Sequence, residues 1–136
     1  MTVAAVLQAV RDRFDAMVAT PLDLRTIHDN APEPADPRAT WCRFVVDLVS
    51  ADQLTVGRVL VRSTGLATAQ LFVPVARGDG VALDLAQAVI DVFRGATISS
   101  PAIRFTPAPS LVGPSELSGG WVARTVRIPF RSDEVA

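Results

Sequence analysis

Residues 65–95 contain both of the periodicities that identify regular secondary structure. Ala67, Leu71 and Val73 alternate with neighbours such as Thr68 and Gln70, which is the period of two expected for a half-buried strand. The sequence Gly-Asp-Gly at 78–80 then interrupts the pattern, and apolar residues recur three and four apart from 81 to 94. The segment therefore predicts a strand, a turn and an amphipathic helix that stops at glycine 95.

The polar side of this predicted helix is narrow. Asp84, Gln87, Asp91 and Arg94 share one face and cover about a third of the circumference at 3.6 residues per turn. A helix with a sheet on one side and water on the other usually has a wider polar face. We therefore expect a second buried neighbour for it, in this chain or in another copy.

The rest of the chain divides by the same patterns. A helix is predicted at 2–19, and further strands are predicted at 41–49, 55–63, 102–106 and 121–130. Turns at 50–53 and 63–65 would make the first three strands an antiparallel meander. Three segments lack periodicity: a proline-rich extended arm at about 21–40, a long loop at about 107–120 and a polar tail at 131–136.

The resulting element order is α-β-β-β-α-β-β. Helices and an antiparallel sheet segregate in chains of this kind. We therefore expect one α+β domain spanning residues 1–136, with a mixed, mainly antiparallel sheet and two helices packed on one face. A chain of this length buries enough surface to fold without a disulfide or metal.

Composition and charge remove several classes of function. The net charge of −1 gives no general polycation for binding nucleic acid, and no apolar run approaches the roughly 18 residues that span a bilayer. Charged residues within the first twenty positions argue against a signal peptide. Glycine brings the apolar share to about 55 %, slightly above the usual 45–50 %. A biased coding sequence or a subunit that buries extra surface in an assembly would each explain this.

Candidate catalytic chemistry is sparse. Cys42 is the single cysteine and lies on the apolar face of a predicted strand, while His28, the single histidine, lies in the arm. A buried thiol as core filler is the simpler interpretation of Cys42. The glycines around Asp79 lack a phosphate-binding motif, and an N-capping turn explains them. We expect no enzymatic activity, no cofactor and no metal site.

Arginine is the one charged residue type with a suggestive placement. Arg43, Arg58 and Arg62 are predicted to share one sheet surface. Such arginines either serve solvation or meet carboxylates, such as Asp84 or Asp91, of a neighbouring copy, because the guanidinium fork suits interface ion pairs.

Several short motifs resemble the tail terminator proteins of long-tailed bacteriophages and the equivalent part of gene transfer agents. The resemblance spans nearly the whole chain and rests on structural residues. Its motifs are Asp29-Asn30-Ala31-Pro32, Trp41-Cys42-Arg43, Gly57, Phe72-Val73-Pro74, Val92-Phe93-Arg94-Gly95, Trp121 and Arg127-Ile128-Pro129-Phe130.

The resemblance implies a structural virion protein without catalytic residues. Such proteins are small α+β subunits that form a ring, usually of six. The ring caps the tail tube, ends its polymerisation and joins it to the neck or connector protein at the head-proximal end of the virion. The protein would be made in the bacterial cytoplasm, and DNA would pass through the lumen without specific binding.

A ring subunit must present two unlike surfaces to its neighbours. We expect subunit or tube contacts from the arm, the predicted arginine surface and the helix 81–94, whereas 50–53 and 107–120 would project toward tube or neck. The residues concerned are Asn30, Pro32, Pro34, Arg38, Arg43, Arg58, Arg62, Asp84 and Asp91. Another head–tail connector protein and a dimeric α+β binding module unrelated to phage remain alternatives.

Overall fold

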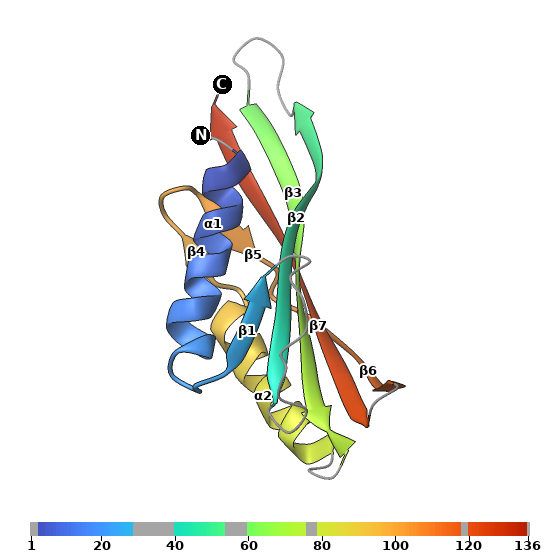
Figure 1. The fold of residues 1–136 in the computed structure, drawn as a ribbon. Coiled ribbons are helices and arrows are strands. Elements are labelled where there is room, and N and C mark those ends of the chain that lie inside the picture. Colours follow the sequence, from blue (N-terminus) through green and yellow to red (C-terminus); the bar gives the residue numbers. More distant parts are fainter. Residues whose placement is uncertain (1–2, 29–39, 54–59, 76–78, 118–119, 136) are drawn as a thin grey trace.

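The computed structural model describes residues 3–28, 40–53, 60–75, 79–117 and 120–135. It is a single α+β domain with two helices and a mixed, mainly antiparallel sheet, as the sequence predicts (Figure 1). Helix α1 (Val3–Phe14) continues into a π-helical turn, η1 (Asp15–Ala19), and α2 is Asp79–Phe93. The strands are β1 (Arg25–His28), β2 (Trp41–Gln53), β3 (Leu60–Pro74), β4 (Thr97–Ile98), β5 (Ile103–Phe105), β6 (Ser110–Leu117) and β7 (Trp121–Val135).

The sheet is built around the long central strands. Its order is β1-β2-β3-β7-β5-β4, and β6 pairs with the other end of β7. β1 runs parallel to β2, and all other pairs are antiparallel. β3 and β7 pair along their full lengths, from Leu60 opposite Val135 to Pro74 opposite Trp121.

Both helices lie on the same side of the sheet (Figure 1) and bury its apolar face. Phe14 of α1 stacks on Phe44 of β2 with ring centroids 4.1 Å apart, and Phe93 of α2 contacts Phe105 of β5 edge-to-face at 5.0 Å. Such aromatic pairs add specific geometry to the burial of apolar area. The alternation predicted for the first strand is confirmed, because Cys42, Phe44 and Val46 are all buried here.

Two predicted turns are wrong. Residues 50–53 belong to β2 and residues 63–65 belong to β3, so one long hairpin replaces the predicted meander. Ser50 and Thr64, which suggested turns, form a cross-strand pair in which the Ser50 hydroxyl donates to Thr64 Oγ1 at 3.2 Å. A one-residue irregularity between Leu48 and Ser50 lets β2 continue past the polar residues.

The three aperiodic segments also contain strands. β1 lies in the predicted arm, β6 lies in the predicted 107–120 loop, and β7 extends to Val135 through the predicted tail. β6 tolerates Gly113 and Pro114 because its pairing with β7 shifts register between Val112 and Ser115. The remainder of the arm, residues 29–39, lies outside the described residues.

Candidate functional site

The helices cover one face of the sheet, and we call the other face of β2, β3, β7 and β5 the open face. Val45, Thr68 and Arg127 lie side by side across it on β2, β3 and β7. Their side chains are half-buried or exposed, whereas their chain neighbours on the helix side are buried. At one end of the open face, Trp41 stacks on Phe72 at 4.1 Å, within a small apolar cluster.

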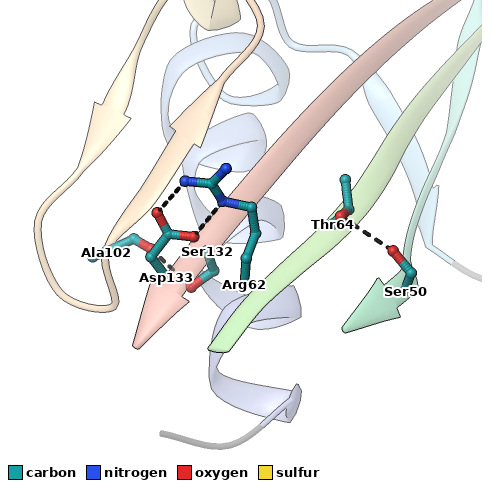
Figure 2. A network of polar contacts seen from close by, with 6 residues as sticks. All are labelled: Ser50, Arg62, Thr64, Ala102, Ser132 and Asp133. Atoms are coloured by element: carbon teal, nitrogen blue, oxygen red, sulfur yellow. Dashed lines mark hydrogen bonds and ion pairs between the residues drawn. The ribbon is translucent and has the colours of Figure 1, made fainter. Parts of the chain in front are cut away.

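At the other end the open face carries an internal ion pair. Arg62 of β3 donates from Nε and Nη2 to the two carboxylate oxygens of Asp133 on β7, at 2.8 and 3.0 Å (Figure 2). This bidentate geometry suits arginine. The hydrogen bond and the charge of Arg62, with added contributions from the charges of Arg131 and Arg104, hold the pKa of Asp133 below its ordinary range.

Two further arginines stand directly opposite each other beside this pair. Arg104 of β5 is the cross-strand partner of Arg131 of β7. Like charges at such positions repel and destabilise the pairing of strands. Within the described residues neither side chain makes an ion pair of its own, and Asp133 is already engaged by Arg62. The pair therefore leaves positive charge available on the open face.

Two shallow hollows flank the Arg104–Arg131 pair. One, of about 210 Å³, lies toward Thr97, Ile98 and Asp133. The other, of about 320 Å³, has mostly apolar walls that include Phe105, Pro107 and Pro129. Arg104 and Arg131 line both hollows. The arrangement offers an anion site next to a place for an apolar side chain.

The predicted arginine surface is only partly formed. Arg43 and Arg62 both project from the open face, but the partner of Arg43 on β3 is Gln70, eight residues from Arg62. At about 3.3 Å per residue the two lie roughly 26 Å apart along the strand. Arg43 packs over the ring of Trp41, 5.6 Å from its centroid, and Arg62 is held by Asp133. They do not form one cluster, and Arg58 lies outside the described residues.

The predicted acidic face of α2 is present. Asp84 and Asp91 are both exposed, and Asp91 accepts a hydrogen bond from Gln87 at 2.8 Å. Leu83 lies beside them, with 39 % of its surface exposed. The helix thus presents two carboxylates and one large apolar side chain to solvent. The four predicted arm residues, Asn30, Pro32, Pro34 and Arg38, lie outside the described residues.

Arg104, Arg131 and Leu83 are absent from the predicted site. No pattern in the sequence singles them out, and only the pairing of β5 with β7 brings the two arginines together. The sequence predicts strands at 102–106 and 121–130 but places residue 131 in a polar tail, whereas β7 continues through it. No local pattern could reveal this cross-strand pair.

Cys42 and His28, the two candidate catalytic residues, both make structural contacts in the fold. Cys42 is fully buried in the core, and burial, together with the charge of Asp15, raises the pKa of its thiol far above the ordinary value. A thiol of this kind is a poor nucleophile. His28 Nε2 lies 3.0 Å from a carboxylate oxygen of Asp15, which ties β1 to η1. Over the described part of the chain, no group of three or more histidine, cysteine or acidic side chains could hold a metal ion.

Comparison with known proteins informs the fold only. No protein family and no curated protein matches the sequence. A solved structure is similar over 93 % of this chain and 95 % of that chain, with a TM-score of 0.69 and 14 % identity. At this identity the likeness supports the α+β architecture. None of the helices described is long and apolar enough to cross a membrane.

Proposed function

We propose that the protein is a tail terminator of a long-tailed bacteriophage or a gene transfer agent, and that it works as a ring of identical subunits. The ring caps the tail tube, stops its growth and provides the surface that receives the neck. The role is structural and uses no catalytic residue, cofactor or metal. The sequence resemblance supplies the identity of the assembly and the expected ring number of six.

One structural observation carries the self-association part of this proposal. The open face bears arginines, and the exposed side of α2 bears Asp84 and Asp91. These surfaces belong to opposite layers of the domain (Figure 1). A subunit with unlike, complementary surfaces on opposite sides can contact two copies at once, as head-to-tail ring closure requires.

The free side of β6 supports contacts with a further protein. β6 pairs only with β7 in the described sheet, and its Leu111 and Val112 are 40 % and 42 % exposed. Exposed apolar edge strands are sites of pairing with other chains. The strand lies in the 107–120 segment that we expected to project toward tube or neck.

Electron microscopy of the purified full-length protein, alone and mixed with tube protein of the same particle, tests the proposal. We expect rings with a central hole, or density capping one end of each tube, and tubes that stop growing once capped. Protein that stays monomeric by light scattering and leaves tube ends bare and growing would overturn the proposal.

The two alternatives predict different outcomes in the same experiment. A connector protein would form rings that leave tube ends bare and tube growth unchanged. A dimeric binding module would give a fixed mass of twice the subunit and no ring. The unlike surfaces on opposite layers favour a ring over the dimeric module, which needs only one self-complementary surface. A connector ring needs the same two surfaces, so tube capping is the result that separates it from the terminator.

A further inference from the structure

We propose that the surface around Arg104 and Arg131 receives helix α2 of the neighbouring copy. Asp84 then lies between the two guanidinium groups, and Leu83 fills the larger hollow, whose walls include Phe105, Pro107 and Pro129. The inference rests on the ring proposed above and names its subunit contact. It commits to a second copy of this chain as the occupant.

The Arg104–Arg131 pair lacks a counter-charge of its own within the described residues. Arg104 and Arg131 face each other across adjacent strands, where like charges directly opposite each other destabilise the pairing. Asp133 lies close enough for both to affect its pKa, yet its carboxylate oxygens are occupied by Arg62. A carboxylate arriving from outside would relieve the repulsion without disturbing the Arg62–Asp133 pair.

The exposed side chains of α2 match the chemistry of the hollow. Leu83 and Asp84 are adjacent in sequence and both exposed on α2. The larger hollow has walls from Phe105, Pro107 and Pro129 next to Arg131. An apolar side chain next to a carboxylate is complementary to an apolar hollow next to two arginines, and residues that fill well-packed, desolvated pockets contribute much of the binding energy of an interface.

The two surfaces lie on opposite layers of the domain. Arg104 alternates with the buried Ile103 and Phe105, so it projects from the side of β5 that faces away from the core. The exposed side of α2 faces away from the sheet on the opposite layer. Contact between these surfaces on two copies is heterologous, so an open chain of subunits keeps one free surface at each end until the ring closes.

Charge reversal tests the contact. We expect Asp84→Arg alone, and the double variant Arg104→Asp with Arg131→Asp, each to weaken self-association roughly tenfold or more, because each leaves like charges facing each other. Combining all three substitutions in one chain should restore association, since the charges are then exchanged. Sedimentation velocity across a concentration series measures this, and circular dichroism checks that each variant is folded.

A matched control separates the contact from general charge effects. Asp12 is, like Asp84, an exposed aspartate on a helix. It accepts a hydrogen bond from Gln8 at 2.8 Å. Asp12→Arg makes the same change in net charge as Asp84→Arg but lies on the other helix. It should leave association within about twofold of the wild type, a difference of about 0.4 kcal/mol.

Leu83→Ser provides a test that does not depend on charge. Its side chain is partly exposed in the isolated subunit, so we expect little change in the unfolding midpoint but weaker association. If all of these variants form rings as the wild type does, this contact is rejected while the proposed function stands. Wild-type protein that forms no assembly, alone or on tubes, would reject both.

Discussion

Gly65 shows how one residue permits the long central hairpin. It lies in β3 opposite Phe130 of β7 and Leu48 of β2. A Cβ atom added to it would lie 2.2 Å from Cζ of Phe130 and 2.8 Å from the backbone oxygen of Asp47. The aromatic ring occupies the space that any other residue would need. The glycine is therefore required by packing, although in the sequence it suggested a turn.

Replacing this glycine tests that interpretation. Gly65→Ala should lower the free energy of unfolding by about 1–3 kcal/mol, the usual cost of overpacking, measured by urea denaturation. Gly80→Ala is the control, because nothing lies within 4 Å of an added Cβ at this position in α2. It should be neutral or stabilise by about 0.4–1 kcal/mol through reduced freedom of the unfolded chain. An unchanged Gly65→Ala midpoint would show that Phe130 moves aside without cost.

Arg124 connects three elements. It projects from the helix side of β7, where the apolar pattern of that strand is interrupted. Its Nε donates to Oδ1 of Asp79 at 2.8 Å, and its Nη1 donates to the carbonyl oxygen of Gly113 at 2.9 Å. The start of α2 and the bend of β6 are thus attached to β7 through one side chain.

The ion pair predicts a pH dependence of stability. The hydrogen bond and charge of Arg124 lower the pKa of Asp79 below its ordinary value of 3.8. The pair therefore stabilises the folded state fully above about pH 5, and this stabilisation is lost as the pH falls through the lowered pKa. Asp79→Asn should be less stable than the wild type at pH 7, and the difference should shrink below about pH 4.

Urea midpoints of both proteins at pH 7, 5, 4 and 3 would measure this difference. Asp47→Asn is the control, since Asp47 is exposed on β2 and has no ion pair among the described residues; its difference from the wild type should stay near zero throughout. A difference for Asp79→Asn that stays constant down to the most acidic point would contradict the assignment of the stabilisation to this carboxylate.

The accuracy of the sequence predictions differs between elements for physical reasons. Both helices, the α+β class and the inward alternation around Phe44 and Phe105 follow from local periodicity. β1 and β6 do not, because short polar or proline-containing strands form only when β2 and β7 supply the hydrogen-bonding partner. Arg104 and Arg131 escaped prediction for the same reason, since strand register, which local sequence does not encode, places them together.

At the scale of the whole molecule, the two-layer design separates its surfaces. Burial of one sheet face under α1 and α2 leaves the arginines of the open face and the carboxylates of α2 pointing in opposite directions. The monomer satisfies Asp79 and Asp133 internally with Arg124 and Arg62. Asp84, Asp91, Arg104 and Arg131 are left without an ion pair among the described residues, and a neighbouring copy can supply the missing partners.

Ionic strength then distinguishes a charged contact from an apolar one. The screening length falls from about 10 Å at 0.1 M salt to about 3 Å at 1 M, so association through Asp84, Arg104 and Arg131 should weaken as sodium chloride is raised over this range. Light scattering at fixed protein concentration should show the mean mass falling toward that of the subunit, while the circular dichroism spectrum stays unchanged. Sodium sulfate strengthens apolar burial. At matched ionic strength it should therefore cause a smaller loss of association, because it strengthens the apolar contact of Leu83. A mean mass that rises with sodium chloride would mean that apolar contacts, such as those of Leu111 and Val112 on β6, hold the subunits together instead.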